Sequence, residues 1–116
     1  MDNDGLADLL RGILGDKPFQ RKLSILSTDL LTGQVVIFDE SLTNEERVES
    51  IISSTSIPFA FEPVEIDDMK LVDGSMYSNL SVGDPIQRCR EEVENDSDII
   101  IDIILCYGTP IELNSW

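Results

Sequence analysis

The sequence contains no histidine, and this absence excludes more chemistry than any other feature of its composition. Histidine is the commonest general base among side chains and one of the commonest ligands of zinc. A Ser-His-Asp triad is therefore impossible within this chain, and a zinc site built on imidazole is excluded with it. We expect neither a cofactor nor a bound metal.

Basic residues are also scarce. The chain has 8 lysines and arginines against 23 aspartates and glutamates, which gives a formal net charge of -15. A surface this acidic repels phosphate backbones and anionic lipid headgroups, and no cluster of basic residues offsets it. Nucleic acid is therefore not an expected partner.

Cysteines are few and long apolar runs are missing. Cys89 and Cys106 lie far apart and form no C-x-x-C pair, and the first twenty residues contain no signal-peptide core. The longest apolar run, residues 99–107, is interrupted by Asp102 and is far shorter than the roughly 18 residues that a membrane-spanning helix needs. We expect reduced thiols in a cytoplasmic protein without a transmembrane segment.

The residues that are present favour a folded chain of one small domain. Hydrophobic residues make up 41% and charged residues 27% of the 116 residues, close to ordinary globular usage. This length is enough for one hydrophobic core and not for two. There is no internal repeat and no low-complexity linker, so we expect a single α/β unit.

The first half of the chain alternates helix and strand patterns. Residues 6–14 predict an amphipathic helix, residues 23–30 and 34–38 predict a hairpin, and Thr43 with Glu46 has the spacing of a capping box that opens a helix to about residue 54. The side chains expected to face the core are Leu6, Leu9, Leu10, Ile13 and Leu14 in the first helix and Val48, Ile51, Ile52 and Thr55 in the second.

The second half continues the pattern. Phe59 and Phe61 are expected in the core rather than in contact with lipid, and residues 64–66 and 69–71 predict a second hairpin, turned at Asp67-Asp68. Asp84-Pro85 is a helix start, and the buried stripe of that helix would be Ile86, Cys89 and Val93. Residues 99–106 are evenly apolar and β-branched, which predicts a strand covered on both faces. Tyr107 to Trp116 is expected to be a trailing loop.

The stretch Leu71-Val72-Asp73-Gly74 places an aspartate directly after the apolar end of a predicted strand, on a glycine turn. One interpretation is a plain turn, because Asp-Gly is a common turn dipeptide. The other is a carboxylate presented at the edge of a sheet. A two-metal reading of Asp67, Asp68 and Asp73 lacks a supporting cluster of further ligands.

Several segments around Asp73 resemble the second half of a patatin-like phospholipase domain. Ser54-Thr55-Ser56-Ile57-Pro58 resembles the family's small-residue helix end, Phe61-Glu62-Pro63-Val64 its F-x-P-V segment, and Leu26 to Gly33 its A-T-D-L-x-T-G strand and turn. The resemblance covers most of the chain. It implies a partial three-layer α/β fold with a mixed sheet and flanking helices, in which residues 1–116 are the C-terminal portion of the domain.

The resemblance also implies a function. Asp73 matches the aspartate of the family's Ser/Asp dyad and Gly74 the glycine behind it, whereas Ser75 and Ser81 depart from the family's pattern. The implied activity is hydrolysis of lipid acyl esters, with a lipid ester as substrate; the substrate-binding residues are not identified.

The nucleophile of that reaction is missing from the sequence. No G-x-S-x-G motif and no glycine-rich oxyanion loop occurs anywhere in it. We therefore expect only the aspartate half of the site here, with a second chain or a missing N-terminal half completing the sheet. A buried-type strand without its neighbour would make the isolated chain marginally stable or associated with another chain. The alternative is a catalytically inactive remnant or an acidic interaction module.

Overall fold

The computed structural model of this protein describes residues 2–104. The chain, which we expected to be one α/β unit, divides into two compact units, residues 1–85 and residues 86 onward. The first unit contains the sheet and two helices and therefore carries the candidate site. Each unit is described by itself.

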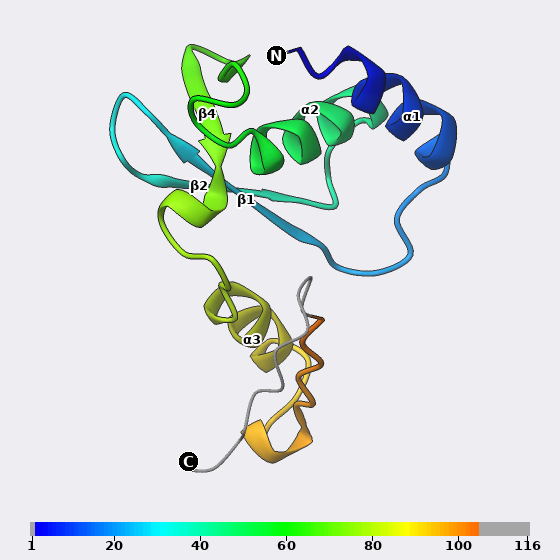
Figure 1. Cartoon of the computed structure of the whole chain (residues 1–116). Coiled ribbons are helices and arrows are strands. Elements are labelled where there is room, and N and C mark those ends of the chain that lie inside the picture. The colour runs from blue at the N-terminus through cyan, green and yellow to red at the C-terminus, as the bar shows by residue number, and fades with distance from the viewer. Residues whose placement is uncertain (1, 105–116) are drawn as a thin grey trace. The chain divides into compact units, whose positions relative to one another are not determined.

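The sheet of the first unit has four strands in the order β2-β1-β4-β3. Figure 1 labels β1, β2 and β4. The strands are β1 Ser24–Asp29, β2 Val35–Asp39, β3 Val64–Ile66 and β4 Met69–Asp73. Both predicted hairpins are confirmed, and so is the α/β class. All three strand pairings are antiparallel rather than mixed. The reason is that β3, the strand that follows the helix crossover, pairs with its hairpin partner β4 and with neither β1 nor β2.

The turn between β3 and β4 explains the acidic pair in the sequence. Asp67 and Asp68 have φ angles of 46° and 60°, the positive values that a two-residue hairpin turn of the I′ type requires. Aspartate tolerates this conformation better than most residues because its short side chain bonds locally. The two carboxylates are therefore accounted for as turn residues.

Helix α2, Asn44–Thr55, packs against β1, β4 and β3. The predicted capping box is confirmed: the amide of Thr43 donates to Glu46 Oε2 at 2.7 Å, and the Glu46 amide donates back to Thr43 Oγ1. Val48 and Ile52 are buried as predicted, but Thr55 is exposed. The face turned toward the sheet carries small residues instead, and the side chains of Ser50 and Ser53 are fully buried. Small side chains let a helix approach a sheet closely, so the serines determine which face of α2 is turned toward the sheet.

Helix α1, Asp4–Leu14, packs on α2 (Figure 1). Ala7, Leu10 and Leu14 join the core around Val48 and Ile52. The other predicted core positions of α1 are wrong: Leu6, Leu9 and Ile13 are exposed, because among residues 2–104 α1 is covered on one side only.

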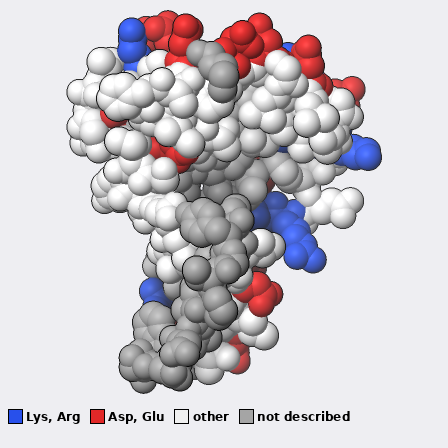
Figure 2. All heavy atoms as spheres, in the orientation of Figure 1, with Lys and Arg blue, Asp and Glu red and all other residues white. Residues whose placement is uncertain are grey.

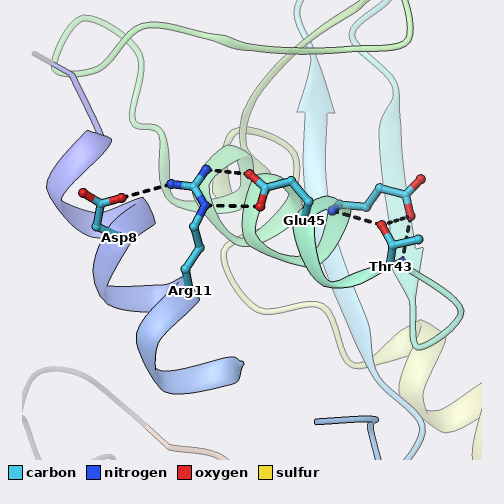
Figure 3. Close-up of polar contacts among 5 residues, drawn as sticks. Asp8, Arg11, Thr43 and Glu45 are labelled. Atoms are coloured by element: carbon cyan, nitrogen blue, oxygen red, sulfur yellow. Dashed lines mark hydrogen bonds and ion pairs between the residues drawn. The ribbon is translucent and has the colours of Figure 1, made fainter. Parts of the chain in front are cut away.

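An exposed arginine links the two helices. Arg11 lies between Asp8 and Glu45 (Figure 3) and donates to both Glu45 carboxylate oxygens, from Nε at 3.2 Å and from Nη2 at 2.5 Å. The hydrogen bond with Glu45 raises the pKa of Arg11 and lowers that of Glu45. Exposed ion pairs contribute little to the free energy of unfolding, so this contact affects the orientation of α1 on α2 more than the stability of the protein.

Helix α3, Gly83–Arg90, begins one residue before the predicted cap, and Pro85 lies in its first turn as expected. Its predicted buried stripe is wrong: no residue of α3 is buried, Cys89 is exposed, and Val93 lies beyond the end of the helix. At the end of the helix Arg90 pairs with Asp96, with Nε and Nη2 donating to the carboxylate at 2.8 and 2.7 Å. This pair holds the short 3₁₀ turn Asp96–Asp98 against the end of the helix.

The buried strand predicted at residues 99–106 is also wrong for the part that the structure describes. Residues 99–104 form no strand, and Ile104 is 92% exposed. A strand requires a neighbour for its backbone donors and acceptors, and among residues 86–104 there is no other strand. Residues 105 and 106 of this prediction, and the predicted trailing loop, lie outside the described residues.

Candidate functional site

Asp73 is the last residue of β4 and lies directly opposite Ser27 of β1 in the sheet register. Its backbone amide donates to the carbonyl of Ser56, at the end of α2, at 2.9 Å. The apolar pair before it, Leu71 and Val72, is fully buried. Asp73 itself is half-buried, so its carboxylate lies at the border between core and solvent.

One oxygen of this carboxylate is held in place. The amide of Ser75 donates to Asp73 Oδ1 at 2.7 Å, which makes Asp73 the N-cap of the 3₁₀ turn Gly74–Met76. A hydrogen bond from a backbone amide restricts the rotation of the carboxylate. Both hydrogen bonds, at the backbone and at the side chain, therefore fix where Asp73 points.

Gly74 supports this turn by its small size. It is buried, and a Cβ atom at this position would lie 2.5 Å from the carbonyl oxygen of Leu26 and 2.9 Å from its carbon. Glycine in an Asp-Gly turn is usually explained by positive φ, but Gly74 is not among the residues with positive φ. The turn is instead packed so closely on β1 that no side chain fits.

The serines near Asp73 do not form a second half of a dyad. Ser27 is the nearest in the register, but it is fully buried and its Oγ lies 2.7 Å from the Oγ of Ser53. A nucleophile has to reach the substrate, and these two hydroxyls are buried between α2 and β1. Ser75, Ser78 and Ser81 follow β4 in the 3₁₀ turn and the loop after it.

A second carboxylate of the sheet, in the segment that resembles the family's strand and turn, is hydrogen-bonded on both oxygens. Asp29, at the end of β1, accepts from the Thr32 hydroxyl at 2.7 Å and from the amides of Leu31 and Lys70 at 3.1 and 3.3 Å. These bonds, above all the one from Thr32, lower the pKa of Asp29. Asp29 is bonded on both oxygens and is a structural residue. In the sequence, this role was indicated by the position of Asp29 shortly before Thr32 and Gly33.

Metal binding finds no support among residues 2–104, where no group of three cysteine, aspartate or glutamate side chains is placed to hold an ion. Asp67 and Asp68 lie at the turn before β4, whereas Asp73 ends the strand. Four residues of strand separate Asp68 from Asp73, which corresponds to roughly 17 Å between the two positions. The three aspartates that the sequence suggested as a set are not brought together.

The first unit is thus an α/β unit that presents a carboxylate at the end of a central strand, on a turn sealed by a glycine. The family model described as patatin-like phospholipase matches residues 1–86. The chain therefore belongs to the patatin-like phospholipase family. A comparison with curated proteins finds no match. The family match ends one residue beyond the boundary between the two units. In residues 2–104, no helix has the length and apolarity required to cross a membrane.

Proposed function

We propose that this chain is the C-terminal portion of a patatin-like lipid acyl hydrolase and that Asp73 is the aspartate of its Ser/Asp dyad. The observation that carries the proposal is the placement of Asp73 at the end of β4, bonded at its amide by Ser56 and at its carboxylate by Ser75, within the matched region. Gly74 would be the residue that allows this turn to lie against β1.

In such a dyad the carboxylate acts as general base. Asp73 would take the proton of a serine hydroxyl as the serine oxygen attacks the ester carbonyl, and would return it to the leaving alcohol. Water would then hydrolyse the acyl-serine ester by the same route, releasing the fatty acid. A base is effective when its position is fixed before the reaction, and the amide of Ser75 fixes one oxygen of Asp73 while the rest of the carboxyl stays at the solvent border.

The serine itself would come from outside these 116 residues. The sequence has no G-x-S-x-G elbow and no glycine-rich loop for the oxyanion, so both would be supplied by a preceding segment or by a second chain that also extends the sheet. No cofactor is needed for this reaction. A cytoplasmic setting is part of the proposal, and the free, exposed thiol of Cys89 supports it.

The missing nucleophile motif also favours a second candidate. A chain that keeps the aspartate turn without a serine partner would be a catalytically inactive remnant or an acidic interaction module. The two candidates differ in whether a polypeptide that supplies the elbow restores turnover.

The test is hydrolysis of p-nitrophenyl butyrate by the purified chain, alone and co-expressed with the first half of a patatin-like domain. We expect no turnover alone and turnover in the co-expressed pair. Asp73→Asn should lower that turnover by roughly 10²-fold or more, the usual contribution of a general base. The matched control is Asp68→Asn, since Asn also tolerates the positive φ of that turn. Equal activity of the two variants would refute the role of Asp73, and failure of every pair to turn over would favour the inactive remnant.

A further inference from the structure

Phe59 adopts a conformation that is unfavourable for its side chain, and it does so at the surface. Its φ angle is 71°, in the left-handed region that favours glycine, and its side chain is fully exposed rather than in the core as predicted. The amide of Ala60 donates to the carbonyl of Ile57 at 3.1 Å, so Pro58 and Phe59 are the two central residues of a turn. The second of these positions, with positive φ, is normally taken by glycine or asparagine. A bulky residue held there is strained, and such strain marks candidate functional positions.

The loop that carries Phe59 lies at the same end of the sheet as Asp73. It leaves α2 at Ser56, whose carbonyl accepts from the amide of Asp73, and it enters β3 at Val64, opposite Leu71. The chain that follows Asp73 contributes Met76 and Tyr77, which are each more than half exposed, as is Ile57. We call the four side chains Ile57, Phe59, Met76 and Tyr77 the Asp73 rim.

The segments that form the Asp73 rim are free of charge. Residues 50–61 and residues 74–83 contain no lysine, arginine, aspartate or glutamate, in a chain of which 27% of the residues are charged. Figure 2 shows most of the visible charged side chains of the first unit gathered along one edge, with broad uncharged areas elsewhere. An apolar, uncharged surface on an acidic protein fits a zwitterionic lipid surface and not an anionic one.

We propose that the loop of residues 57–61 inserts the Phe59 ring into a zwitterionic lipid surface and so brings that surface to Asp73. The inference rests on the proposed function, because a lipid ester can reach Asp73 only where this end of the sheet meets the lipid. Aromatic side chains are well suited to the boundary between headgroups and acyl chains. The strained turn would serve to point the ring away from the core that phenylalanine normally occupies.

The experiment measures partition of the full chain onto phosphatidylcholine vesicles by co-sedimentation, which needs no turnover. The main variant, Phe59→Gly, removes the ring and also relieves the positive φ, so it should fold at least as well as the native chain. We expect a loss of roughly tenfold or more in partition, the value of burying one large apolar side chain. Phe59→Trp should keep the binding, and Phe59→Asn, whose side chain tolerates the same φ, should lose it.

Two controls separate this proposal from the catalytic one. Leu31→Ala removes an exposed apolar side chain at the β1–β2 turn. Leu31 lies four residues after Ser27, which faces Asp73, toward the end of the sheet that carries the β3–β4 turn, and the variant should bind as the native chain does. Asp73→Asn should also bind normally, whether or not the dyad exists. Either of two results overturns the proposal. One is that the native chain does not bind these vesicles, which is the result expected if the Asp73 rim contacts protein instead. The other is that Phe59→Gly binds them as well as the native chain does.

Discussion

Replacing Gly74 by alanine tests how closely the aspartate turn is packed. The added Cβ would lie 2.5 Å from the Leu26 carbonyl oxygen and 2.9 Å from the carbonyl carbon. Both atoms belong to the backbone of β1, which is paired on both sides and cannot move as a flexible side chain would. Real Cβ atoms do not approach other atoms this closely, so either β1 or the turn must shift. Overpacking of this kind typically costs about 1–3 kcal/mol.

The assay is equilibrium unfolding in urea, followed by circular dichroism. For a protein of this size, the expected loss corresponds to a decrease of about 1 M in the urea midpoint. The matched control is Gly12→Ala. Gly12 lies inside α1 with nothing within 4 Å of an added Cβ, so this change should raise stability by about 0.5–1 kcal/mol. A Gly74→Ala variant as stable as the native chain would refute the packing argument, and with it the reason given for glycine behind Asp73.

Two further predictions concern β1. Thr28 is buried and its hydroxyl oxygen has no hydrogen-bond partner. Thr28→Val should therefore raise the free energy of unfolding by about 1 kcal/mol. A clear decrease in the urea midpoint of this variant would show that the hydroxyl has a hydrogen-bond partner in solution. The pKa of Asp29 is lowered by folding, so its contribution is complete above its ordinary value of 3.8 and is lost as the pH falls through the lower, folded value. Urea unfolding across the acid range should therefore show a loss of stability below about pH 4 that is smaller in Asp29→Asn, and identical acid profiles for the two proteins would contradict this.

The sequence predicts this fold best where the signal is local. The capping box of Thr43 and Glu46 and the turn at Asp67-Asp68 depend on residues within a few positions of each other, and both are found as predicted. The position of Asp73 at the end of a strand is equally local, because it directly follows the apolar pair Leu71 and Val72.

The sequence could not predict the features that depend on which helices and strands pack against each other. The face of α2 turned to the sheet is set by its buried serines rather than by Thr55, and half of the apolar face of α1 has no covering element in the described residues. The strand pattern at residues 99–104 gave no strand, because a strand depends on a neighbour that the pattern does not contain.

Gly74 shows a second limit. Its place after Asp73 was clear from the sequence, but the reason for it, the contact with Leu26 of a strand almost fifty residues earlier, is visible only in three dimensions. Phe59 shows a third limit, because hydrophobicity alone predicts burial and the turn geometry reverses it.

The most direct test of the central claim is the ratio of ester turnover between Asp73→Asn and Asp68→Asn, each co-expressed with a first half that carries the G-x-S-x-G elbow. Both variants remove one carboxylate charge, and only Asp73 is placed at the end of β4. If Asp73 is the general base, the turnover of Asp73→Asn is about 10²-fold or more below that of Asp68→Asn. A ratio near one in an active pair would contradict the assignment.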